Sequence, residues 1–161
     1  MIQVAIVDDH QIVRTGFREL LSEDSKIRIA FEASSGDEAL DKLRTAQCDV
    51  LLLDISLPGK SGVDVLRTVR QRHPDIKVLI LSGFPEAHYA TTLLRQGASG
   101  YINKEADPEE IVKAIRTVAL GRSWTTFRGK RLLVHEVKVH DGPAQGAPGT
   151  LLMVGDSVHV V

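Results

Sequence analysis

The chain has 161 residues, of which 43% are apolar and 25% charged, and its formal net charge is −1. This length allows one domain or one domain with an appendage, and the nearly neutral charge excludes strong non-specific attraction to nucleic acid. The single cysteine, Cys48, excludes an internal disulfide bond. No apolar run approaches the roughly 20 residues of a membrane-spanning helix, and the N-terminus shows no signal peptide, so a cytoplasmic protein is expected.

Short apolar runs alternate with segments of helical periodicity five times before residue 121. Strands are predicted over 2–7, 27–31, 49–53, 76–81 and 99–103. Helices are predicted over 11–22, around 39–43 and 63–69, over 87–96, and from the N-cap Asp107 to Gly121. Five such units with right-handed crossovers indicate an α/β fold with a doubly wound, five-stranded parallel sheet. Because the strand at 27–31 is among the most polar and belongs at an edge, the flavodoxin-like order 2-1-3-4-5 is favoured.

The composition changes after Gly121. Residues 1–121 hold 15 basic and 18 acidic residues, whereas residues 122–161 hold 5 and 3, so the local net charge changes sign. Alternating apolar residues predict short strands over 131–139, 151–154 and 158–161, with a loop rich in proline and glycine over 142–149. We therefore expect a domain over residues 1–121 and a short β-like tail over 122–161.

Charged residues follow three of the predicted strands at the point where each strand ends. Asp8 and Asp9 follow the first strand, Asp54 follows the third, and Lys104 follows the fifth. In an open parallel sheet the ligand crevice lies at the carboxyl ends of the strands, so these four side chains are expected to converge. Three neighbouring carboxylates repel one another and need a cation, and a lysine beside them suits a phosphoryl group. The pattern predicts a pocket for Mg²⁺ and a phosphorylated aspartate.

Four motifs at these strand ends resemble those of one signalling family. They are VDDH at 7–10, LDISLPG at 53–59, LSG at 81–83 and GYINK at 100–104. With them, residues 1–121 resemble the receiver domain of two-component response regulators. The segments VRTGF at 13–17 and GASGY at 97–101 resemble most the NarL/FixJ (LuxR-type) branch of that family.

This resemblance implies a role for each carboxylate in the pocket. Asp54 matches the phospho-acceptor, which would receive its phosphoryl group from a sensor histidine kinase. Asp9 and Asp54 would bind Mg²⁺ directly, and Asp8 would act through a water molecule or by positioning the others. The main-chain carbonyl of Ser56 matches a further ligand of the ion. Hard oxygen donors of this kind are those that Mg²⁺ prefers.

The resemblance also implies how the signal is passed on. Lys104 would pair with a phosphoryl oxygen, the Ser82 hydroxyl would bind the new phosphoryl group, and Tyr101 would rotate inward as Ser82 moves. Such a switch would favour a homodimer and alter transcriptional output. No enzymatic activity is implied beyond self-phosphorylation from donors and slow autodephosphorylation.

The tail departs from the pattern of this branch. NarL/FixJ regulators usually carry a four-helix DNA-binding unit with a helix-turn-helix, and residues 122–161 are too short for it. We therefore expect no specific DNA binding by this chain and no membrane association. Because every predicted site residue lies at or before Lys104, removal of 122–161 is expected to leave phosphorylation intact.

Other functions are compatible with parts of the pattern. A haloacid-dehalogenase-type phosphohydrolase also forms an aspartyl phosphate, but it places a second aspartate where this chain has His10, two residues after Asp8. A flavodoxin-like cofactor binder needs a phosphate-cradling loop where Asp8 and Asp9 would repel phosphate. A receiver-like interaction module that is never phosphorylated fits every residue. Taken alone, Asp8 and Asp9 also suit the N-terminus of a helix.

Overall fold

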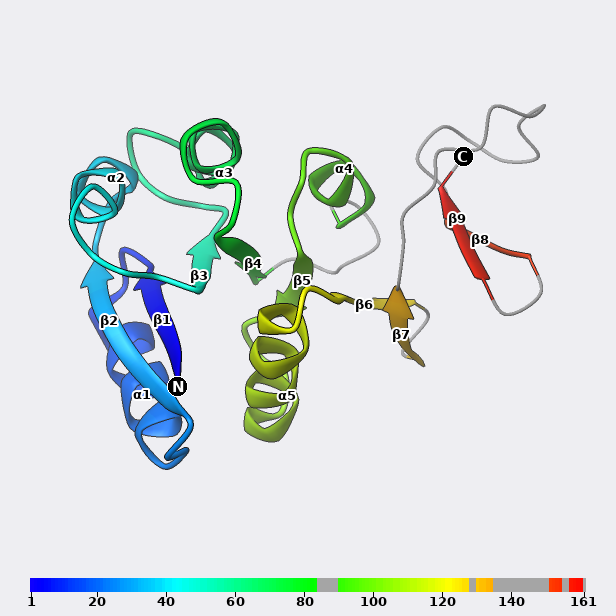
Figure 1. Cartoon of the computed structure of the whole chain (residues 1–161), viewed down its shortest axis with the longest axis horizontal. Coiled ribbons are helices and arrows are strands. Elements are labelled where there is room, and N and C mark those ends of the chain that lie inside the picture. Colours follow the sequence, from blue (N-terminus) through cyan, green and yellow to red (C-terminus); the bar gives the residue numbers. More distant parts are fainter. Residues whose placement is uncertain (84–89, 128–129, 135–150, 155–156, 161) are drawn as a thin grey trace.

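The computed structural model describes residues 1–83, 90–127, 130–134, 151–154 and 157–160 (Figure 1). Strands and helices alternate from the N-terminus to residue 119, and strands follow. In chain order the elements are β1 (Ile2–Val7), α1 (Gln11–Ser22), β2 (Ile27–Ala33), α2 (Gly36–Lys42), β3 (Val50–Asp54), α3 (Gly62–Arg72), β4 (Lys77–Ser82), α4 (Ala90–Arg95), β5 (Gly100–Asn103), α5 (Pro108–Ala119), β6 (Ser123–Phe127), β7 (Lys130–Val134), β8 (Leu151–Val154) and β9 (Ser157–Val160).

The first five strands form a parallel sheet in the order β2-β1-β3-β4-β5, which confirms the predicted topology with β2 at one edge. The sheet does not end at β5. β6 pairs with β5 in parallel through Gly100 and Trp124, and β7 pairs with β6 antiparallel. The sheet therefore has seven strands where five were predicted, and it runs past the predicted domain boundary at residue 121, which itself stays a prediction.

The tail prediction is confirmed for some segments and lies outside the described residues for others. The strand predicted over 131–139 corresponds to β7, and residues 135–139 and the loop at 142–149 lie outside the described residues. β8 and β9 match the strands predicted over 151–154 and 158–161, apart from Val161, which is not described. They form a separate two-stranded antiparallel sheet. α4 matches the helix predicted over 87–96, of which 87–89 lie outside the description.

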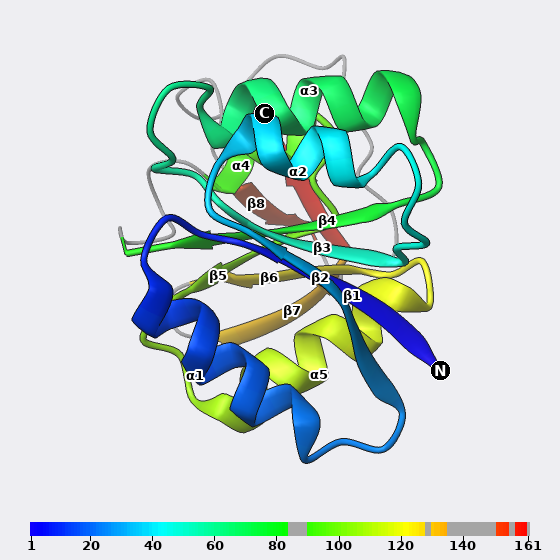
Figure 2. The ribbon, with the colours of Figure 1, turned by 90° about the vertical axis from the view of Figure 1, so that its left-hand side faces the viewer.

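Helices cover both faces of the sheet, with α2 and α3 on one face and α1 and α5 on the other (Figure 2). Alternate residues of each central strand enter opposite cores, so β3 buries all five of its residues, and the four before Asp54 form a continuous apolar run. One core includes Leu51, Leu53 and Tyr101, and the other includes Leu52 and Trp124. No helix among the described residues has the length and apolar character needed to cross a bilayer.

Local sequence signals explain where α5 begins and ends. Asp107 is the N-cap, and its carboxylate accepts a hydrogen bond from the Glu109 amide at 3.0 Å. Pro108 occupies the first turn, where no amide donor is needed. Beyond the helix, Gly121 adopts a φ of 77°, a left-handed conformation that glycine accepts without strain. The predicted helix over this segment is confirmed.

The N-terminus of α2 holds a carboxylate with a strongly perturbed pKa. Glu38 pairs with Lys42 at 2.6 Å and accepts hydrogen bonds from the amide and hydroxyl of Ser34 at 2.7 and 2.8 Å. Its own amide donates to Ser35, the N-cap. The hydrogen bonds from Lys42 and then from Ser34 lower the pKa of Glu38 from 4.5 to about 2. The ionised form of Glu38 therefore stabilises the start of this helix.

Replacing Glu38 with glutamine is expected to lower the free energy of unfolding at pH 7 by about 1 kcal/mol, because the side chain is 38% exposed and screened by solvent. The folded pKa lies below the unfolded value, so the contribution of Glu38 is present above pH 4.5 and is lost as the pH falls toward 2. Urea denaturation at pH 7 and pH 3 measures this change. The exposed Asp41→Asn on the same helix is the control, and a difference between Glu38→Gln and wild type that stays equal at both pH values contradicts the assignment.

Candidate phosphorylation and metal site

The carboxyl ends of four central strands bring the predicted site residues to one edge of the sheet. Asp54 is the last residue of β3 and Ser82 is the last residue of β4. Asp8 and Asp9 follow β1, and Lys104 follows β5. The convergence that the sequence predicted is therefore present for Asp8, Asp54 and Lys104, which come from three different strands.

Lys104 joins two buried carboxylates. Its ammonium lies 2.7 Å from Asp8 Oδ2 and 2.8 Å from Asp54 Oδ2, and these aspartates are 0% and 1% exposed. Burial disfavours the ammonium, but its hydrogen bonds to Asp54 and Asp8 outweigh burial and raise the pKa of Lys104. The lysine therefore stays charged and neutralises part of the repulsion between the two aspartates. The sequence predicts Lys104 only as a partner of a phosphoryl oxygen, whereas the structure shows it paired with both carboxylates.

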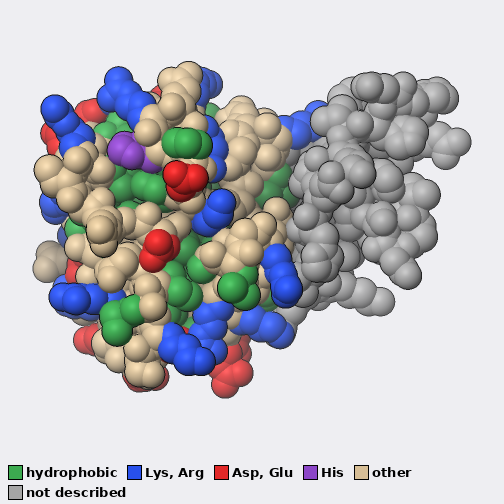
Figure 3. Space-filling view, in the orientation of Figure 1, with side chains coloured by type: hydrophobic (Ala, Val, Ile, Leu, Met, Phe, Trp, Pro, Cys, Tyr) green, Lys and Arg blue, Asp and Glu red, His purple; other side chains and the backbone are tan. Residues whose placement is uncertain are grey.

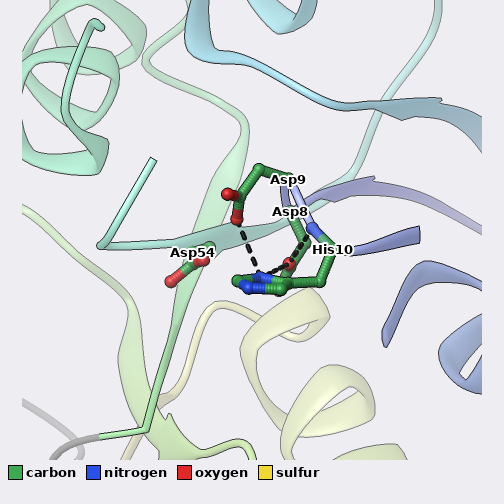
Figure 4. A group of neighbouring side chains, drawn as sticks. All are labelled: Asp8, Asp9, His10 and Asp54. Carbon is green, nitrogen blue, oxygen red and sulfur yellow. Dashed lines mark hydrogen bonds and ion pairs between the residues drawn. The ribbon is translucent and has the colours of Figure 1, made fainter. Parts of the chain in front are cut away.

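His10 also belongs to this cluster, which sequence analysis did not predict. Its amide donates to Asp8 Oδ1 at 2.8 Å, and its imidazole Nδ1 lies 3.2 Å from Asp8 Oδ1 and 2.9 Å from Asp9 Oδ1. Figure 4 shows dashed lines from His10 to the carboxylates of Asp8 and Asp9, with Asp54 beside them on β3. The signal that could have identified His10 is its place in the same short loop, two residues after Asp8. The Asp8 side chain closes a turn of this loop by accepting the hydrogen bond from the His10 amide.

The helix that follows this loop tests the alternative role of Asp8 and Asp9. α1 begins at Gln11, and its N-cap is His10 with extended backbone. Asp8 instead directs its carboxylate to Lys104 and to His10. The alternative in which these aspartates serve only to cap the helix therefore does not hold for Asp8, because its buried side chain is paired with Lys104, which follows another strand.

The loop after β3 holds Asp54 in a fixed place. The Ser56 amide donates to Asp54 Oδ1 at 3.0 Å, and the Gly62 amide donates to the Ile55 carbonyl at 3.2 Å. A Cβ atom at Gly62 would lie only 2.3 Å from the Asp54 carbonyl oxygen, so a larger residue does not fit there. Glycine at this position allows α3 to begin directly against the backbone of the acidic residue.

The predicted switch residues lie on the neighbouring strands β4 and β5. Ser82 is buried, and its carbonyl accepts a hydrogen bond from the Lys104 amide at 2.9 Å. Tyr101 is fully buried in the core beneath α2, α3 and α4, and its backbone pairs with Ile80 in the sheet. These positions connect the acidic cluster to β5, and a movement of either side chain stays a prediction.

The donor set of the pocket suits a hard cation. Among the described residues, Asp8, Asp9, His10 and Asp54 offer ligand atoms that all lie within 4.8 Å of one another. Three of these four donors are carboxylates, and two of the carboxylates are buried. Carboxylate oxygens held this closely fit Mg²⁺, which takes oxygen ligands and retains several waters.

Residues 4–116 match the protein family described as the response regulator receiver domain. The chain belongs to this family. Its receiver domain accounts for the parallel sheet, and the acidic cluster lies at the carboxyl ends of that sheet's strands. The family resemblance found in the sequence is thereby confirmed.

Similar proteins place this receiver domain among the NarL and LuxR-type regulators. It is 40% identical over 124 residues to the response regulator GacA of Pseudomonas viridiflava, covering 77% of this chain and 58% of GacA. The chain is 37% identical over 137 residues to the transcriptional regulatory protein DegU of Brevibacillus brevis, covering 85% of this chain and 58% of DegU. This chain therefore spans somewhat more than half the length of these relatives.

Solved structures agree with this placement. The receiver domain is 35% identical to the signal receiver domain of the putative response regulator NarL from Mycobacterium tuberculosis, with a TM-score of 0.69 over 75% of this chain and 98% of that one. A LuxR-family response regulator from Aurantimonas gives 33% identity and a TM-score of 0.69, over 77% of this chain and 88% of that one. These matches confirm the predicted NarL/FixJ (LuxR-type) assignment.

Proposed function

We propose that this receiver domain accepts a phosphoryl group on Asp54 in a reaction that depends on Mg²⁺. The observation that carries the proposal is the buried pair Asp8 and Asp54, held together by Lys104 at the carboxyl ends of the strands. Burying two carboxylates beside each other costs free energy. A structural role does not call for such a pair, whereas an acceptor carboxylate beside a cation site needs it.

The residues of the chain divide the chemistry among them. An Asp54 carboxylate oxygen attacks phosphorus, an O–P bond forms, and the bond from phosphorus to the donor breaks with its electron pair leaving on the donor. Ser56 and Lys104 orient the acceptor, because the Ser56 amide binds Asp54 Oδ1 and the Lys104 ammonium binds Asp54 Oδ2. After the transfer, the Lys104 ammonium can pair with a negatively charged phosphoryl oxygen on Asp54. Asp9, Asp54 and the Ser56 carbonyl would hold Mg²⁺, with Asp8 acting through water or by positioning, and the bound ion would supply positive charge that stabilises the phosphoryl group during transfer.

The physiological donor in this proposal is a sensor histidine kinase, and the protein works in the cytoplasm. Phosphorylation draws in Ser82, which shifts Tyr101 and changes homodimerisation and, in a longer regulator, transcription. The protein acts as a signalling protein, with self-phosphorylation from small donors and slow autodephosphorylation as its only reactions. We propose that this chain does not bind specific DNA sequences. Basic and acidic residues are interspersed on the face shown in Figure 3, and sequence-specific binding needs an element shaped to a groove of the DNA.

Incubation with a small acyl phosphate donor and Mg²⁺ is expected to add one phosphoryl group, measured by intact mass. Asp54→Asn removes the addition, because the amide is not a nucleophile of this kind, and chelation of Mg²⁺ slows it strongly. The exposed Asp64→Asn serves as the matched control and keeps the wild-type yield. Hydroxylamine removes the group, as it does from an acyl phosphate.

Two outcomes decide against the proposal. A wild-type yield in Asp54→Asn places the acceptor elsewhere. No addition to the wild-type protein, under conditions where Mg²⁺ binds, identifies an interaction module that is never phosphorylated. Multiple turnovers of a phosphate ester with release of inorganic phosphate would instead indicate the phosphohydrolase.

A further inference from the structure

One arginine binds the backbone of the acidic loop. The guanidinium Nη1 of Arg14, on α1, donates to the main-chain carbonyl of Asp8 at 2.6 Å. The amide of Arg14 donates to the carbonyl of His10 at 3.2 Å. Arg14 therefore holds both ends of the three-residue loop that carries Asp8 and Asp9, once through its backbone and once through its side chain.

The guanidinium is itself held by an ion pair on the neighbouring strand. Glu32, on β2, lies 3.7 Å from Arg14 Nε and 2.8 Å from Arg18 Nη1. The Arg14 side chain is largely buried, with 15% of its surface exposed. Lys42 fixes the main chain of Glu32 by donating to its carbonyl at 2.7 Å. Because the planar guanidinium is paired with Glu32 through Nε, its Nη1 atom has less freedom to turn away from the Asp8 carbonyl.

Other contacts of Asp8 leave its main-chain carbonyl to Arg14. The Asp8 amide donates to the Ala33 carbonyl at 3.1 Å, and its two carboxylate oxygens contact His10 and Lys104. With the guanidinium in place, the amide, the carbonyl and Oδ1 of this buried residue have hydrogen-bond partners, and Oδ2 has its ion pair with Lys104. Loss of the guanidinium would free the peptide that links Asp8 to Asp9 to rotate, and Asp9 is the predicted direct ligand of Mg²⁺.

We propose that Arg14 is a positioning residue that presents the Asp8 and Asp9 carboxylates to the divalent cation. This inference rests on the proposed function, which makes that cation Mg²⁺. Arg14 touches neither the cation nor the acceptor and acts through the Asp8 carbonyl. Residues that orient metal ligands in this way typically change metal affinity by about tenfold or more when removed.

Arg18 provides a matched control for this role. Within the part of the chain that the structure describes, Arg18 contacts Glu32 and Thr15 and does not reach the Asp8 carbonyl. Arg18→Gln and Arg14→Gln thus make the same chemical change on the same helix and remove a partner of the same glutamate. Only Arg14→Gln removes the contact with the acidic loop.

Two measurements on the full chain separate the variants. In the metal-free protein, hydrogen exchange at the His10 amide, which donates to Asp8 Oδ1, is expected to become faster in Arg14→Gln and to stay at the wild-type rate in Arg18→Gln. In a Mg²⁺ titration followed by NMR, the dissociation constant is expected to rise about tenfold in Arg14→Gln only. Phosphorylation at saturating Mg²⁺ returns toward the wild-type rate, because the acceptor is unchanged.

The same experiments can overturn the inference. Equal effects of the two substitutions, or wild-type exchange and affinity in Arg14→Gln, assign Arg14 to the stability of α1 alone. If Arg14→Gln does not fold, Arg14→Met keeps the apolar stem and removes the donor to the Asp8 carbonyl, and wild-type values for it overturn the role. A wild-type protein that binds no Mg²⁺ refutes the proposed function instead, and amide exchange alone then decides whether Arg14 holds the loop.

Discussion

Replacing Trp124 with alanine is expected to lower the free energy of unfolding by about 3–5 kcal/mol, the usual cost of removing a large aromatic side chain from a core. Trp124 is 2% exposed and packs against the core shared by α1 and α5. Its amide donates to the Ser99 carbonyl at 2.9 Å, which fixes β6 to the end of the sheet. Urea denaturation followed by circular dichroism measures the loss.

Truncation gives the same prediction a second test. A chain that ends at Gly121 lacks Trp124 and exposes the edge of β5, so it is expected to lose at least as much stability and to aggregate more readily. A chain that ends at Val134 keeps β6 and β7 and is expected to retain most of the stability. Trp124→Phe, which keeps an aromatic ring in the core, is expected to cost less than half as much as alanine. Equal stability of the full chain and the chain ending at Gly121 would contradict this role.

Replacing Lys104 with methionine is expected to destabilise the metal-free protein by about 3–5 kcal/mol, because it leaves two buried carboxylates without their shared cation. Methionine keeps most of the apolar stem, so the loss reports the charge and not the packing. Addition of Mg²⁺ is expected to recover part of the stability, since a bound cation again neutralises the aspartates. Thermal denaturation with and without Mg²⁺ measures both effects.

Two further variants show whether this loss comes from the buried pair. Lys60→Met removes an exposed ion pair with Asp37, and it is expected to cost less than about 1 kcal/mol. Lys104→Met combined with Asp8→Asn is expected to be more stable than Lys104→Met alone, because one of the two repelling charges is gone. A loss in Lys104→Met no larger than that in Lys60→Met would show that the lysine does not neutralise the pair.

Much of the fold follows from local patterns in the sequence. The run 50–53 is apolar throughout because β3 is covered on both faces, and Asp107 and Pro108 mark the start of α5 by their own chemistry. The carboxyl ends of parallel strands meet in one place, so the convergence of Asp8, Asp54 and Lys104 could be predicted as well.

Features that depend on distant contacts could not be predicted in the same way. The residues of β6 are rich in types that favour strands, but its pairing with β5 depends on Gly100, where a Cβ would lie 2.6 Å from the Trp124 carbonyl oxygen. The contacts of Lys104 with both aspartates depend on where β1, β3 and β5 end relative to one another in the sheet. The place of His10 between Asp8 and Asp9 depends on how the loop turns, and only the three-dimensional structure shows it.

The pairing of β5 with β6 places an intrinsic fluorophore, Trp124, next to β5. Trp124 is the single tryptophan of the chain, and it lies in an apolar core, so its indole emits at shorter wavelength than an indole in water. β5 pairs with Trp124 through Gly100 at one end and leads into Lys104 at the other. Fluorescence of the unlabelled protein therefore reports whether the tail strand stays docked, and a change at the acidic edge that moves β5 is recorded by the same signal.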